Sequence, residues 1–144
     1  MRKLFTVFAL TVFAVSISCS QTTDKQKENA NGPKIEFSTF EHDYGTITTG
    51  SDGTCEFDFK NTGNEPLILN DVHSTCGCTV PSWPREPIKA GETSKITVKY
   101  NTNRIGPINK QITVSSNATK NPVILKIRGN VIPKPAENQE EKTN

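Results

Sequence analysis

Two cysteines separated by one glycine, Cys76-Gly77-Cys78, are the residues of this sequence best suited to chemistry. A bridge between them would close a small, strained ring, and strained bridges are reduced more readily than ordinary ones. The pair therefore has a structural interpretation, as packed thiols or a structural bridge, and a redox interpretation, as a switch or exchange site. The surrounding sequence lacks the βαβ context of thioredoxin-like enzymes. Both interpretations stay open.

A metal site is a third hypothesis for the same segment, because His73 lies three residues before Cys76 and Asp71 is nearby. One imidazole and two thiolates are ligands that zinc and cuprous copper accept. Two thiols so close together chelate poorly alone, a fourth ligand is not evident, and His42 is distant in sequence. The candidate ligands are therefore His73, Cys76 and Cys78. We expect no other cofactor.

Trp83 lies between Pro81 and Pro84, shortly after the cysteine pair. An exposed tryptophan could anchor a protein partner, since tryptophan is enriched among the residues that dominate binding energy. The alternative is that Trp83 covers one end of a hydrophobic core.

No catalytic constellation appears in the sequence. It has neither a nucleophile-elbow motif nor a glycine-rich phosphate loop. Carboxylates such as Glu56 and Asp58 alternate along one predicted strand, on the face expected to meet water. We therefore expect a protein that is not an enzyme.

The first 18 residues have the form of a secretory signal. Arg2 and Lys3 supply a positive start, and a largely apolar tract follows from Leu4 to Ile17. A stretch of this length is too short to cross about 30 Å of hydrocarbon at about 1.5 Å per residue. It suits the apolar region of a cleaved signal peptide.

The end of this tract, Ser18 followed by Cys19, resembles the lipobox of bacterial lipoproteins. In that class the cysteine thiol receives a diacylglyceryl group and the signal is cut just before it. Ser16 departs from the pattern, which usually has a large aliphatic residue there. We expect lipidation of Cys19 and attachment to a membrane, with ordinary secretion as the alternative.

Two polar segments flank the part of the chain expected to fold, residues 33–132. Residues 20–32 contain one apolar side chain and cannot bury enough surface to offset the entropy lost on ordering. We predict that residues 19–32 are a lipidated cysteine followed by a flexible tether. Residues 133–144 have the same character and are predicted to be a disordered tail.

The composition fits one ordinary globular domain, with 144 residues, 22% charged and 33% hydrophobic. Once Arg2 and Lys3 are removed with the signal, basic and acidic residues are equal in number at 15 each. A neutral protein has no built-in field for nucleic acid or for an anionic membrane surface. We therefore expect no nucleic-acid partner.

Alternation of apolar and polar residues with a period of two predicts an all-β fold. It is clearest over residues 55–60, 95–100, 112–114 and 123–128, and weaker candidates cover 35–37 and 44–47. Residues 67–72 break phase, as a bulge would. Turn signals separate these runs at Asn61–Asn64, Ala90–Glu92, Gly106–Pro107 and Asn117–Pro122. About seven short strands predict an antiparallel β-sandwich of immunoglobulin type, with a closed barrel as the alternative.

Cys55 falls on the predicted core face of its strand, but nothing near Ile112 to Ser115 could complete an immunoglobulin bridge with it. After Cys19 is used, three cysteines remain, so at least one lacks a disulfide within the protein. Cys55 is therefore expected to be a buried thiol.

The motifs together resemble the family called domain of unknown function 1573, found largely in envelope proteins of Gram-negative bacteria. The resemblance spans roughly Phe37 to Val131. It rests on the Asn61-Thr62-Gly63 turn, Cys76-Gly77-Cys78-Thr79, Ala90-Gly91-Glu92, Ser116-Asn117 and Leu125-Lys126-Ile127-Arg128-Gly129. It implies an immunoglobulin-like sandwich akin to modules of cilia- and centrosome-associated proteins. It implies no established activity.

These observations predict a membrane-tethered, non-enzymatic module on the periplasmic or outer side of the cell envelope. Its expected role is to bind or scaffold another envelope component. The alternative is a thiol-redox or metal-handling protein that uses Cys76 and Cys78.

Overall fold

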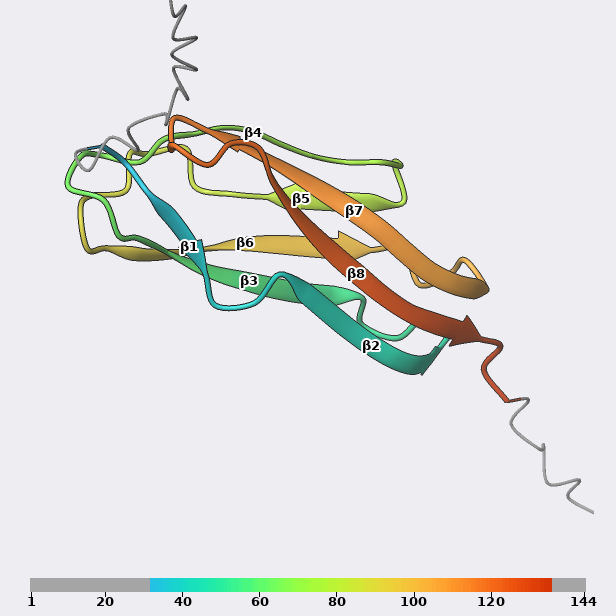
Figure 1. Ribbon diagram of the computed structural model, residues 1–144. Helices are drawn as coiled ribbons and strands as arrows, with labels where there is room; N and C mark the ends of the chain where they lie inside the picture. Colours follow the sequence, from blue (N-terminus) through green and yellow to red (C-terminus); the bar gives the residue numbers. More distant parts are fainter. Residues whose placement is uncertain (1–31, 136–144) are drawn as a thin grey trace, which may run out of the picture.

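A computed structural model describes residues 32–135 as an all-β fold (Figure 1). The predicted signal peptide, the tether before residue 32 and the tail after residue 135 lie outside the described residues. No helix within residues 32–135 is long and apolar enough to cross a bilayer. The eight strands are β1 (Ile35–Phe37), β2 (Glu41–Thr48), β3 (Thr54–Asn61), β4 (Leu69–Ser74), β5 (Thr79–Ser82), β6 (Thr93–Tyr100), β7 (Gly106–Ser116) and β8 (Val123–Ile132).

The strands form two four-stranded sheets, in the orders β1-β3-β6-β5 and β2-β8-β7-β4 (Figure 1). The predicted two-layer sandwich is confirmed, with eight strands rather than seven. The additional strand is β5, which follows directly after the cysteine pair.

The second sheet is mixed, whereas the sequence predicted antiparallel pairing throughout. Strand β2 pairs with β8 in parallel, while the other neighbours in both sheets are antiparallel. The chain continues from β1 into β2 in the same direction and changes sheet on the way (Figure 1). Because β8 runs in that direction too, the pairing between β2 and β8 is parallel.

Alternation along the strands builds the core. In β3 the side chains of Cys55, Phe57 and Phe59 are buried and those between them are exposed. Phe57 is paired in register with Ile96 of β6, which is also fully buried. The outward residues are charged and solvated, as a sheet with one wet face requires.

Two bulges interrupt the edges of the second sheet. The pairing of β4 with β7 shifts between Leu69 and Asp71, which confirms the predicted break in phase. The pairing of β2 with β8 shifts between Asp43 and Thr46, where Gly45 has a φ of 62°. A side chain at Gly45 would be strained in that left-handed conformation.

The chain enters the sandwich at one end, here called the near end, and leaves it at the opposite, far end (Figure 1). At the near end, the carbonyl of Gly32 accepts a hydrogen bond from the amide of Asn64 at 3.3 Å. At the far end, the carbonyl of Ile132 accepts one from the amide of Thr49 at 2.9 Å. The far end also carries the turns at residues 49–53, 75–78 and 101–105.

The predicted turn at Gly106-Pro107 is wrong, because both residues belong to β7. The turn lies just before them, between β6 and β7. Pro107 is accommodated near the start of its strand, where a missing amide hydrogen costs little.

Candidate functional site

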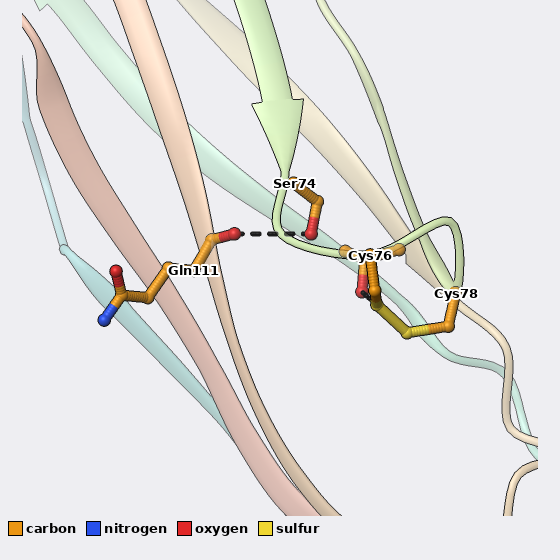
Figure 2. Close-up of a disulfide and its surroundings, with 5 residues drawn as sticks. Ser74, Cys76, Cys78 and Gln111 are labelled. Carbon is orange, nitrogen blue, oxygen red and sulfur yellow. Dashed lines mark hydrogen bonds between the residues drawn. A yellow bond between two sulfur atoms is a disulfide. The ribbon is translucent and has the colours of Figure 1, made fainter.

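The Cys76–Cys78 disulfide is at the far end, where the chain passes from the edge of one sheet to the edge of the other (Figure 2). The Cα atoms of the two cysteines are 5.3 Å apart. Cys76 is half-buried, while Cys78 is only 8% exposed and belongs to the core. The two sulfurs therefore differ in their access to solvent.

Thr79 brings a hydroxyl group to both sulfur atoms. Its Oγ1 is 3.8 Å from the Sγ of Cys76 and 3.9 Å from the Sγ of Cys78. The Thr79 side chain is buried, and its amide donates to the carbonyl of Cys76 at 3.3 Å. A hydroxyl in this position can donate a hydrogen bond to either sulfur.

Hydrogen bonds, in addition to the disulfide, fix both ends of the turn. Figure 2 shows the Ser74 hydroxyl directed at the carbonyl of Gln111 in β7, at 3.3 Å. The amide of Thr75 donates to the same carbonyl at 3.2 Å. On the other side, the amide of Asn101 donates to the carbonyl of Cys78 at 2.9 Å. The turn is thus attached to both sheets through its backbone.

The disulfide closes a very short loop and adds correspondingly little stability. Cys76 and Cys78 are two positions apart. Loop-closure entropy for a ring of about three residues amounts to about 1.6 kcal/mol, compared with about 3 kcal/mol for 15 residues. Stabilisation of the fold is therefore a weak reason for the bridge.

A hollow of about 720 Å³ lies beside the disulfide at the far end. Three separate segments line it. The turn before β3 contributes Gly50–Gly53, and the cysteine turn with the start of β5 contributes Gly77, Cys78 and Val80. The end of β6 with the turn that follows contributes Lys99–Asn103. Val80 is 61% exposed, and Ile105, just beyond the third segment, is 62% exposed. The hollow thus has one strongly exposed apolar side chain, Val80, in its lining.

Charges of both signs line this hollow. Hydrogen bonds from the side chain and backbone of Thr54 hold the pKa of Asp52 below its ordinary value of 3.8. Asp52 is therefore ionised at neutral pH. Lys99 supplies the opposite charge, so the hollow has no strong net charge.

Cys55 is a buried free thiol, as predicted. Burial raises its pKa above the ordinary 9.0, which keeps the thiol neutral and a poor nucleophile. The hydroxyl of Tyr44 lies beside it and donates to the carbonyl of Gly53 at 2.7 Å. Burial also raises the pKa of Tyr44 strongly. This pair belongs to the core and not to a reactive site.

The predicted metal ligands do not come together in this state. His73 is exposed, and its Nδ1 is 2.7 Å from a carboxylate oxygen of Asp71. The sulfurs of Cys76 and Cys78 are bonded to each other and so cannot act as thiolate ligands. Within residues 32–135, no group of three or more histidine, cysteine, aspartate or glutamate side chains is placed to hold a metal ion.

Trp83 lies after β5 and away from the cysteine turn. Its half-buried ring packs against the core, and the guanidinium carbon of Arg85 is 3.7 Å from its centroid. Its Nε1 is buried and has no hydrogen-bond partner among the residues that the structure describes. Trp83 therefore does not contribute to the far-end hollow.

Sequence reasoning found the cysteines but not the hollow. Its lining comes from segments that are far apart in the chain and become adjacent only when β3, β6 and β5 pair in one sheet. Gly53 lets two of these segments approach closely, because an added Cβ would overlap the carbonyl oxygen of Tyr100 and lie 2.8 Å from Thr102 Cγ2, but this approach has no signature in the sequence.

A family model described as "Protein of unknown function (DUF1573)" matches residues 35–131, which cover nearly all of the sandwich. The chain belongs to the DUF1573 family. The predicted family resemblance is thereby confirmed. A comparison with curated protein sequences finds no match.

Solved structures similar to this DUF1573 protein support the fold. A protein of unknown function from Porphyromonas gingivalis W83 has a TM-score of 0.62 at 18% identity, over 70% of this chain and 48% of that one. The chain thus spans about half the length of that protein. PapD-like domain 7 of human CEP192 has a TM-score of 0.60 at 12% identity, over 86% and 99%. The secreted serine protease VesC of Vibrio cholerae has a TM-score of 0.52 at 14% identity, over 75% and 24%.

Proposed function

We propose that this protein is a membrane-anchored lipoprotein of the bacterial cell envelope whose sandwich binds or scaffolds another envelope component without catalysis. Acyl chains on Cys19 hold it to the membrane, and residues 20–32 form the tether. Several acyl chains give firm attachment, because each buried methylene adds about 0.8 kcal/mol.

The observation that carries this proposal is the separation between the chain's point of entry and the far-end hollow (Figure 1). The tether joins the sandwich at the near end, through Gly32. Residues 20–32 reach at most about 45 Å when fully extended, at about 3.3–3.6 Å each. The far end is therefore the end of the module opposite its attachment to the tether, where it is free to meet other envelope components.

The far end has the properties of a binding surface. Val80 and Ile105 are the most exposed large hydrophobic residues in the described part of the chain, and both are at this end. Apolar side chains surrounded by polar groups are typical of the centre of a protein interface. Fold-level analogy with a PapD-like domain favours a binding role but supplies no partner.

Photocrosslinking in living cells tests the binding proposal. A photoreactive phenylalanine analogue replaces Ile105 at the far end, and the control carries it at Ile124, which is 38% exposed on β8. We expect a discrete crosslinked species from position 105, at least fivefold stronger than any from position 124. Equal crosslinking at both positions, or none at position 105, would contradict the proposal.

Metabolic labelling with a radioactive fatty acid tests the anchor. We expect label on the wild-type chain and none on Cys19→Ala, because the thiol is the acceptor of the lipid. An unlabelled wild type, or equal label on the two chains, would reject the anchor while leaving a secreted binding module.

A further inference from the structure

We propose that the Cys76–Cys78 disulfide is a thiol–disulfide exchange site that takes two electrons from a dithiol protein of the envelope. Cys76 is the sulfur that is attacked, and Cys78 is the leaving group. This chemistry is separate from the proposed binding role, and each can fail without the other.

The difference in exposure between the two sulfurs sets the direction of attack. Exchange requires an incoming thiolate to reach one sulfur in line with the bond. Cys76 is half-buried at the surface of the turn, whereas Cys78 is 8% exposed and packed in the core. An incoming thiolate therefore reaches Cys76, and Cys78 receives the displaced electron pair.

Thr79 provides the hydrogen bond that the leaving group needs. A thiolate at Cys78 would be costly in its buried position without a donor. The Thr79 hydroxyl is 3.9 Å from that sulfur and 3.8 Å from the sulfur of Cys76. It can therefore serve the thiolate of Cys78 in the first step and that of Cys76 in the second.

The disulfide can open while the turn keeps its position between the two sheets. Its two ends are tied to the sheets by the bonds of Thr75 and Ser74 to the Gln111 carbonyl and by the bond from Asn101 to Cys78 (Figure 2). None of these bonds involves sulfur. Reduction is thus local and does not require the sandwich to unfold.

The exchange transfers two electrons and two protons from the dithiol to the disulfide. A thiolate of the dithiol attacks the Sγ of Cys76, the bond between Cys76 and Cys78 breaks, and its electron pair goes to Cys78. The second thiolate of the dithiol then attacks the dithiol's own sulfur in the mixed disulfide and releases Cys76. The dithiol ends as a disulfide, and its two protons reside on Cys76 and Cys78.

Redox titration of the full chain is the first test. The chain is expressed with its leader, purified in detergent and equilibrated with mixtures of reduced and oxidised glutathione, and free thiols are counted by mass-tagged alkylation. We expect Cys76 and Cys78 to open together within the glutathione range while the β signal in circular dichroism is unchanged. A bridge that stays closed in fully reduced glutathione, or that opens only when the protein unfolds, would overturn the proposal.

Two single variants test which sulfur is attacked. Cys78→Ser leaves the Cys76 thiol, and Cys76→Ser leaves the Cys78 thiol; each folded variant is exposed to oxidised glutathione. We expect the mixed disulfide to form at least tenfold faster on Cys76. Equal rates, or a faster reaction on Cys78, would contradict the assignment.

A third variant tests the hydroxyl without removing either sulfur. Thr79→Val keeps the shape of the side chain, and Thr97→Val on β6 is the control. We expect dithiothreitol to reduce the Thr79→Val bridge about fivefold more slowly, with the control unchanged. An unchanged rate in Thr79→Val would show that Thr79 is only a packing residue and would overturn its role in the exchange.

Discussion

Asn61 is a buried polar residue that joins several segments at the near end. Its Nδ2 donates to the carbonyls of Glu65 at 2.8 Å and Ile88 at 3.0 Å. Its Oδ1 accepts from the amides of Gly63 at 3.0 Å and Lys34 at 3.4 Å. The sequence marked this residue only as part of a turn, because a turn asparagine and a buried one have the same local pattern.

Replacing Asn61 by alanine should be costly, since it leaves buried backbone donors and acceptors without partners. We expect Asn61→Ala to lower the free energy of unfolding by about 2–3 kcal/mol. The control is Asn109→Ala, at an exposed position of β7, which should change it by less than about 0.5 kcal/mol. Urea denaturation of both variants measures the difference, and equal midpoints would contradict this role.

The buried thiol of Cys55 and the hydroxyl of Tyr44 give the fold a dependence on alkaline pH. Burial raises both pKa values in the folded state, so the folded protein holds these protons more tightly than the unfolded chain. Their contribution to stability is complete below pH 9, near the ordinary value of 9.0 for Cys55, and is lost as pH rises through the folded pKa values.

We therefore expect the free energy of unfolding to fall as pH rises above 9. Cys55→Ala should lessen this slope, because it removes one of the two groups. Chemical denaturation at a series of pH values measures the slope in wild type and variant. A slope that is the same in both would show that Cys55 does not contribute.

At the scale of elements, Gly63 allows the turn after β3 to approach the start of the sandwich closely. A Cβ at this position would overlap the carbonyl oxygen of Gly32 and the amide of Lys34, and would lie 2.8 Å from the Cα of Pro33. All three are backbone atoms, which cannot move aside singly. The glycine is therefore required by space rather than by its φ angle.

We expect Gly63→Ala to destabilise the protein by more than about 2 kcal/mol, since the first strand must shift. Gly77→Ala is the matched control, because a Cβ there meets nothing within 4 Å. Thermal unfolding should show a clearly lower midpoint for Gly63→Ala only. Similar midpoints in the two variants would mean that the near end adjusts more easily than proposed.

The sequence predicted the strands that bury one face and expose the other to water, because their residues alternate between apolar and polar. Strand β3 alternates cleanly because its inner residues meet β6 and its outer residues meet water. Strand β5 was missed because it has four residues, one of them Pro81, and begins directly after the cysteine turn. The parallel pairing of β2 was missed because a change of sheet between consecutive strands has no local signature.

The candidate site likewise combines a feature that is local in the sequence with features set by tertiary contacts. The cysteine pair was visible because its spacing is local, but the state of the two thiols stayed open until the turn itself could be described. The exposure of Val80 and Ile105 depends on which turns meet at the far end. Such a surface is set by tertiary contacts, and no period in the sequence reports it.

At the scale of the whole molecule, the proposed anchor and the far-end hollow belong to one arrangement. The chain enters at the near end (Figure 1), whereas Val80 and Ile105, the two most exposed large hydrophobic residues of the described part of the chain, lie at the far end. If the protein acts as an anchored binding module, the partner should meet the far end only while the sandwich is held at the membrane.

The most direct measurement is photocrosslinking from position 105 in cells that carry either the wild-type anchor or Cys19→Ala, normalised to the amount of exported protein. We expect the crosslinked species to be present with the anchor and to fall at least fivefold without it. An undiminished crosslinked species in Cys19→Ala, or its absence from both, would contradict the account of an anchored binding module.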